Sequence, residues 1–146
     1  MPTQPTPEAR EDYNALLEFL MPFAEQMLKK NGEFFPFGAS VSAEGEVQAC
    51  ATYDGDETPA SEDVIAMLVQ GFQNEARDGK IRATGICYDG RIVQDGKTVD
   101  AVIISLEHFG GSASKTCVPY TKGMFGKYRF GELTAVLAEP QIFVNA

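Results

Sequence analysis

The stretch Asp100-Ala-Val-Ile-Ile-Ser-Leu-Glu-His-Phe-Gly-Gly111 decides the fold. It is an apolar run that ends at the only histidine of the chain and is followed by a Gly-Gly turn. Successive side chains of a strand point to opposite faces of a sheet, and here both sets are apolar. This pattern is typical of a strand near the sheet centre that is covered on both sides. We expect helices to cover one face and loops or a partner subunit to cover the other.

Turn signals on both sides of this run predict further strands. Asp95-Gly96 precedes it and Gly110-Gly111 follows it, so the neighbouring strands are expected to pair as hairpins. A turn at 43–45 predicts a separate, earlier hairpin whose first strand begins near Pro36 or lies at a sheet edge, because proline cannot donate a ladder hydrogen bond. The strands are expected over 33–42, 46–53, 81–93, 99–109 and 113–120, with a last short one within 128–136.

Apolar residues at helical spacing predict two helices. Thr6-Pro7 supplies a capping side chain and a proline at the first helical position, and Asn31-Gly32 is a stop signal. Pro22 lies inside the pattern and is expected to kink or split this helix. The second helix is expected to begin at Ser61 and to end at Asp78-Gly79. The apolar positions are Leu16, Leu20, Phe23 and Met27 in the first helix and Val64, Ile65, Leu68, Val69, Phe72 and Ala76 in the second.

The predicted element order is helix, two strands, helix and three strands, with room for an extra strand. Because short turns join the strands, the sheet is expected to be antiparallel, with about five to six strands. Two main helices packed on one face of this sheet give a two-layer α+β domain. We expect residues 1–6 to be a flexible N-terminus and residues 7–146 to form one domain, since 146 residues is an ordinary domain length.

Composition favours a cytoplasmic protein. No apolar run approaches the roughly 18 residues that span a bilayer, and the first residues lack the pattern of a signal peptide. Cys50, Cys87 and Cys117 are an odd number of cysteines at wide spacing, which predicts reduced thiols packed as small hydrophobic side chains. We therefore expect neither a membrane partner nor a disulfide framework.

The net charge of −9 is unevenly distributed. Residues 1–78 carry 15 acids and 4 Lys/Arg, a net of −11, whereas residues 79–146 carry 6 acids and 8 Lys/Arg, a net of +2. An acidic half of this kind argues against nucleic-acid binding, which requires clustered Lys and Arg. It is compatible with a basic protein partner, because complementary charge speeds association. A solvated acidic surface that keeps the protein in solution is the simpler interpretation.

Few residues offer catalytic chemistry, and His108, Glu107, Lys115 and Tyr120 are the candidates. Glu107 and His108 are expected to point to opposite faces of their strand, so they cannot form an oriented pair. A two-residue turn would pair Ile104 with Cys117 and place His108 roughly 13 Å from that thiol. A three-residue turn would move Cys117 to the opposite face and set Glu107 across from Lys115. We interpret His108 as a strand-end residue near the surface that lacks an orienting partner and a pocket.

Cofactor and metal motifs are missing from the sequence. One histidine and three scattered cysteines give no zinc spacing, and the acidic segment 54–57 lacks the ligand pattern of a calcium loop. The glycines do not form a phosphate-binding loop. We expect no cofactor and no metal.

Aromatic residues cluster in two short segments, around Phe34 and along 124–130. Core packing is expected to account for more than half of them. The remainder predict an exposed apolar patch that contacts a subunit or partner, best placed on the glycine-containing loop. The interface candidates are Met124, Phe125, Tyr128, Phe130 and Phe34.

Three segments are similar to landmarks of a family of small bacterial proteins of unknown function: Phe35-Pro-Phe-Gly-Ala39, the run 100–108 and Val118-Pro-Tyr120. This resemblance implies no catalytic residues. The predicted element order also resembles the profilin-like group, which includes roadblock-type and longin-type domains. Those folds often dimerise or act as scaffolds, and the resemblance implies the same here.

Three functions compete at this point. The first is a non-catalytic cytosolic interaction or regulatory domain, expected to be a homodimer. The second is an acidic inhibitor or immunity-type protein that binds a basic partner. The third is a small-molecule-binding protein or enzyme with a pocket near His108.

Overall fold

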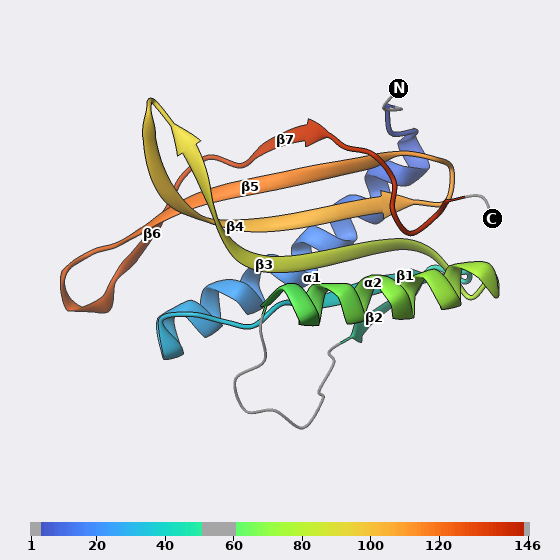
Figure 1. Ribbon diagram of the computed structural model, residues 1–146, viewed down its shortest axis with the longest axis horizontal. Helices are drawn as coiled ribbons and strands as arrows, with labels where there is room; N and C mark the ends of the chain where they lie inside the picture. The colour runs from blue at the N-terminus through green and yellow to red at the C-terminus, as the bar shows by residue number, and fades with distance from the viewer. Residues whose placement is uncertain (1–3, 51–60, 145–146) are drawn as a thin grey trace.

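The computed structural model describes residues 4–50 and 61–144, which form two helices, seven strands and one short 3-10 turn (Figure 1). The predicted loop at 54–59 lies outside the described residues, as do residues 1–3 of the predicted N-terminus. In chain order the elements are α1 (Pro7–Asn31), β1 (Phe37–Ser42), β2 (Val47–Cys50), α2 (Ser61–Arg77), β3 (Ile81–Gln94), β4 (Lys97–His108), β5 (Ala113–Lys122), η1 (Met124–Gly126), β6 (Tyr128–Phe130) and β7 (Thr134–Leu137).

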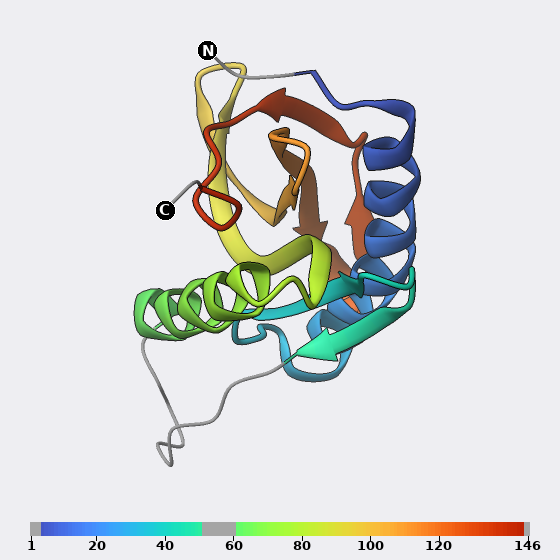
Figure 2. The ribbon, with the colours of Figure 1, turned by 90° about the vertical axis from the view of Figure 1, so that its right-hand side faces the viewer.

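The strands form one curled antiparallel sheet in the order β2-β1-β3-β4-β5-β6 (Figure 2). β7 lies beside β6 on the same edge and pairs with the first half of β5, through Ser114–Cys117. The α+β class, the antiparallel sheet and the two helices agree with the sequence prediction. The predicted last strand within 128–136 is two short strands, β6 and β7, which pair with different parts of β5 in registers that differ by one residue.

The two helices pack on opposite faces of the sheet, which corrects the expectation that they share one face. Adjacent residues of β1 show this, since Gly38 faces α2 and Ala39 faces α1. A Cβ on Gly38 would lie 3.2 Å from the Phe72 ring, and one on Gly85, the partner of Ala39, would lie 2.7 Å from Leu20. Glycine at both positions therefore lets one helix approach each face. Strands with apolar side chains on both faces accept this arrangement.

β4 is the centre of the sheet, as the apolar run predicts. Its residues Ala101–Ile104 and Leu106–His108 are buried. Val102, Ile104 and Leu106 pack in the core beneath α1. On the other face the chain after β7, residues 138–144, crosses the sheet, and its Ile142 packs in the α2 core. We call residues 138–144 the C-terminal strap.

Local signals place the ends of α1 as predicted. Thr6 caps the helix by accepting a hydrogen bond from the Ala9 amide, and Gly32 ends it in the left-handed conformation. The helix is continuous through Pro22. Its buried face differs from the prediction, because Asp12 and Tyr13 are buried whereas Phe23 is about half exposed.

Candidate functional site

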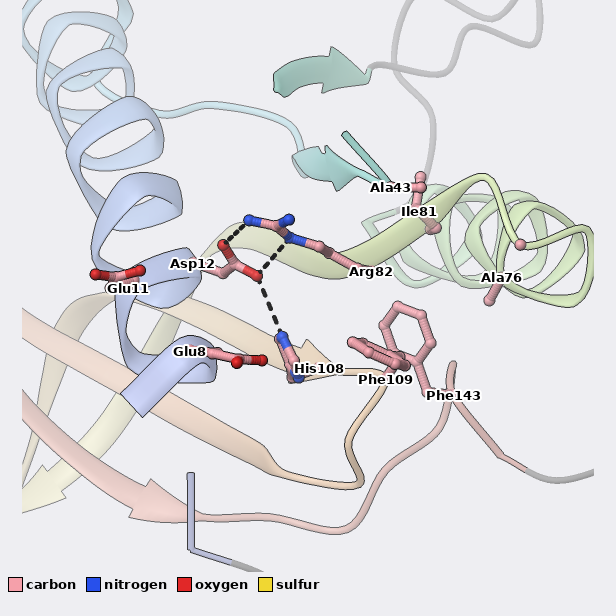
Figure 3. Close-up of a pocket in the computed structure, with 11 residues that line it drawn as sticks. Glu8, Glu11, Asp12, Ala43, Ala76, Ile81, Arg82, His108, Phe109 and Phe143 are labelled. Carbon is pink, nitrogen blue, oxygen red and sulfur yellow. Dashed lines mark hydrogen bonds and ion pairs between the residues drawn. The ribbon is translucent and has the colours of Figure 1, made fainter. Parts of the chain in front are cut away.

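A cavity of about 460 Å³ opens beside His108, where α1, α2, β3 and the C-terminal strap meet (Figure 3). Three kinds of side chain line it: carboxylates from α1, an arginine and a histidine from the sheet, and apolar side chains from β3, α2, two turns and the C-terminal strap. They are Glu8, Glu11, Asp12, Ala43, Ala76, Gly79, Ile81, Arg82, His108, Phe109 and Phe143.

Asp12 connects Arg82 and His108 in one cluster (Figure 3). Its two carboxylate oxygens accept hydrogen bonds from Arg82 Nε at 3.0 Å and from Nη2 at 2.9 Å. Asp12 Oδ2 also lies 3.2 Å from His108 Nε2. Asp12 and His108 are about 95% buried, so the bond between them is shielded from water, whereas the Arg82 side chain is partly exposed. The cluster fixes α1 against β3 and β4.

The hydrogen bonds of His108 define its protonation. Its Nδ1 accepts a bond from the Gly110 amide at 3.2 Å, so Nδ1 carries no proton. The proton of the neutral ring is therefore on Nε2, where it donates to Asp12. Both ring nitrogens are occupied, and neither is free to act as a base toward the cavity.

The interpretation of His108 as a surface residue without a partner or pocket is wrong. Its exposed fraction is 3%, Asp12 orients it, and it lines the cavity. The sequence reasoning failed because the partner is 96 residues away in the chain. One signal was present: Asp12 lies four and eight residues before Leu16 and Leu20, on the buried side of α1. Arg82 had no comparable signal.

Tyr13 holds the chain that follows β4. Its hydroxyl lies 3.0 Å from the Ser112 carbonyl, to which it donates, and 2.7 Å from the Ser112 hydroxyl. Burial raises the pKa of Tyr13 above its ordinary value, which keeps the donor protonated. The ring is edge-on to His108, with centroids 6.5 Å apart. The hydrogen bonds from Tyr13 to Ser112 fix the turn that contains Gly110, and this turn positions the Gly110 amide that donates to His108 Nδ1.

Glu107 lies on the other face of β4, as strand geometry predicts, and binds the C-terminal strap. Its Oε1 accepts from the amides of Gln141 at 3.0 Å, Ile142 at 2.8 Å and Phe143 at 3.3 Å. Its Oε2 accepts from the Gln141 amide at 2.9 Å. The carboxylate is buried and holds three consecutive backbone amides. Phe143, the last of them, lines the cavity beside His108.

The structure has neither of the two registers considered for the hairpin of β4 and β5, so Glu107 does not face Lys115. The register places Ala113 opposite Glu107 and Ser105 opposite Lys115. The turn begins one residue earlier than expected, since the His108 amide donates to the Ser112 carbonyl oxygen and the Gly111 amide donates to the His108 carbonyl oxygen. Cys117 pairs with Ile103, so it lies on the face opposite His108, and the conclusion that these two residues form no nucleophilic pair holds.

Tyr120 lies at the other end of β5 and belongs to a separate polar contact. Its hydroxyl donates to Asp89 at 2.6 Å. Burial raises the pKa of both groups, and the hydrogen bond from Tyr120 partly opposes this for Asp89. The four candidates His108, Glu107, Lys115 and Tyr120 therefore do not converge on one site.

The interface candidates divide into exposed and packed residues. Met124 is 77% exposed and Phe125 is 94% exposed. Tyr128 and Phe130 pack against the core around Tyr120. Phe34 is buried against Phe37, so it offers no surface to a partner.

No protein-family model, curated protein or solved structure matches this chain. The resemblances drawn from the sequence therefore stay predictions. Neither described helix combines the length and hydrophobicity needed to cross a membrane. Within residues 4–50 and 61–144, no three His, Cys, Asp or Glu side chains gather in a way that could hold a metal ion.

Proposed function

We propose that this protein binds a small molecule in the cavity beside His108. The observation that carries the proposal is the concave site itself, with the Asp12–Arg82–His108 cluster, of which Asp12 and His108 are buried, fixed in its wall. Its volume of about 460 Å³ falls in the range of roughly 300–1,000 Å³ typical of small-molecule sites.

The site is built for binding in a fixed geometry. Asp12 accepts two parallel hydrogen bonds from Arg82, and His108 is hydrogen-bonded at both ring nitrogens. These side chains therefore cannot rearrange without breaking hydrogen bonds. Binding to preorganised groups avoids the cost of ordering them. An occupied imidazole is a poor general base, which favours ligand binding over catalysis.

The single histidine makes the proposal testable by NMR. Its ring gives one set of imidazole signals, and a fragment library screened against labelled protein is expected to include compounds that shift them. Ala43 is exposed and lines the cavity, so Ala43→Phe is expected to reduce the space and abolish those shifts. Ala66→Phe, at an exposed position of α2 that does not line the cavity, is the matched control. If no fragment shifts the His108 signals in a way that Ala43→Phe removes, the proposal is wrong.

The Met124–Phe125 turn supports a second candidate, self-association. Phe125 adopts φ 62°, a left-handed conformation that costs a non-glycine residue about 1–2 kcal/mol. Its ring is 94% exposed and contributes nothing to the described core. A strained, exposed aromatic side chain is expected where it contacts a partner.

Light scattering coupled to size-exclusion chromatography tests this candidate. We expect a dimer for the wild-type protein that Phe125→Ser weakens, and Val93→Ser, at another exposed apolar position, leaves unchanged. A wild-type monomer at tens of micromolar would refute self-association through this turn.

A further inference from the structure

We infer that the ligand of the His108 cavity is a small organic cation with an apolar group next to its charge. This inference rests on the proposed function, because it names the chemical class of the ligand for the same site. Three features of the lining support it: the net charge, the aromatic wall, and the pairing of the one arginine.

The ionisable lining is acidic. It consists of three carboxylates, those of Glu8, Glu11 and Asp12, and one guanidinium, that of Arg82, while His108 is neutral. Arg82 directs Nε and Nη2 to Asp12, so one carboxylate and the arginine compensate each other. Glu8 and Glu11 make no ion pair with any residue that the structure describes. The cavity therefore presents a net charge of about −2 to a ligand.

The carboxylates and the apolar side chains lie on different sides of the cavity (Figure 3). Glu8 extends from α1 to the space beside His108, while Phe109 and Phe143 lie next to each other on the far side of the imidazole. Phe109 is 61% exposed, although its ring lies only 4.9 Å from that of His108. Phenyl rings attract cations through their faces and bury the hydrocarbon part of a ligand. A cation with an apolar group can place its charge beside the carboxylates and its apolar group against the two phenyl rings.

Other ligand classes fit less well. An anion would approach Glu8 and Glu11 without a free cation to compensate them. A metal ion that enters the cavity would lose water ligands on the side of the phenyl and alkyl groups, which supply no ligand atoms to replace them. A neutral ligand would cover the two carboxylates while giving them no counter-charge.

Three probes of similar size separate these classes: 2-phenylethylammonium, 2-phenylethanol and 3-phenylpropionate. Each is titrated into labelled full-length protein while the His108 imidazole signals are followed. We expect the ammonium probe to bind about tenfold more tightly than the alcohol, from one carboxylate contact and one cation–π contact, and the carboxylate probe to be weakest. Added salt is expected to weaken binding of the ammonium probe only.

Glu8→Gln tests the residue that carries the charge argument. It is expected to reduce the preference for ammonium over alcohol by about fivefold, because one exposed carboxylate contact is removed. Glu18→Gln, an exposed acid further along α1 that does not line the cavity, is expected to leave the preference unchanged. Equal thermal unfolding of the two variants verifies that the fold is intact.

The outcomes separate this inference from the proposed function. If the alcohol or the carboxylate probe shifts the His108 signals at lower concentration than the ammonium probe, the ligand class is wrong and the binding site stands. An unchanged preference in Glu8→Gln also overturns the ligand class. If none of the three probes binds, the inference fails, and the fragment screen with Ala43→Phe then decides whether the proposed function fails with it.

Discussion

Removal of the Glu107 carboxylate is expected to detach the C-terminal strap. Three consecutive amides, those of Gln141, Ile142 and Phe143, donate to this one buried group. In Glu107→Ala these donors lose their acceptor, and the Ile142 amide loses it at a buried position. The strap then either keeps three unpaired donors or leaves the sheet, and the less costly response determines the loss of stability.

The structure sets the size of the effect. A hydrogen bond to a charged acceptor contributes about 1.5–3 kcal/mol, and burial of an isoleucine side chain such as Ile142 contributes about 1.5–3 kcal/mol. Detachment returns about 1–2 kcal/mol of conformational entropy for each residue released. We therefore expect Glu107→Ala to lower the free energy of unfolding by about 3 kcal/mol. Glu107→Gln keeps the Oε1 acceptor, which receives bonds from all three amides, and is expected to lose only about 1 kcal/mol.

Urea unfolding followed by circular dichroism measures both variants, with Glu139→Ala as the control because Glu139 is exposed on the same strap. Hydrogen exchange of the amides at 141–143 reports detachment directly and is expected to quicken in Glu107→Ala only. If Glu107→Ala unfolds within about 0.5 kcal/mol of the control and these amides exchange at the wild-type rate, the carboxylate does not hold the strap.

Four further outcomes are expected. Burial raises the pKa of Asp89, so the folded protein binds a proton there more readily than the unfolded chain does. The free energy of unfolding should therefore rise as pH falls through that pKa, in the acid range above the ordinary value of 3.8. Asp89→Asn should remove this rise in urea titrations. Gly38→Ala should destabilise by about 1–3 kcal/mol in the same assay, because the new Cβ would lie 2.8 Å from the Gly85 carbonyl oxygen; a neutral result would contradict the close approach of β1 and β3. Phe125→Gly should raise the melting temperature while weakening any dimer, since it relieves a left-handed φ; a lower melting temperature would show that the ring stabilises the fold. Cys87 should react with a thiol reagent only on unfolding, because burial raises the pKa of its thiol; labelling at the native rate of Cys50 would contradict this.

Local sequence signals predicted most of the fold. Thr6 and Gly32 bound α1 because their capping chemistry is local, and Asp95-Gly96 forms the predicted turn with both residues at positive φ. The apolar run around Val102 predicted a central, two-sided strand because alternation along a strand is also local. The side of the sheet that each helix covers was not predictable in the same way, since it depends on pairing between distant strands.

The candidate site was largely hidden from the sequence. Asp12, Arg82 and His108 come together across separations of 70 and 96 residues, with no motif spacing to link them. The contact between Glu107 and the strap is likewise set by the path of the chain after β7. Strand alternation correctly predicted that Glu107 and His108 lie on opposite faces and do not pair. It did not reveal their actual partners, which are the strap amides and Asp12.

The position of Phe143 makes the C-terminal strap and the cavity thermodynamically linked. The same short segment supplies a backbone amide to Glu107 and an aromatic ring to the cavity. Any ligand that contacts this ring binds the strapped state more tightly than the released state, and by reciprocity it must slow amide exchange at 141–143. Proteolytic removal of the strap should lower the affinity for that ligand by the ratio of its affinities for the strapped and released states. Exchange at these three amides would therefore detect a ligand whose identity is not yet known.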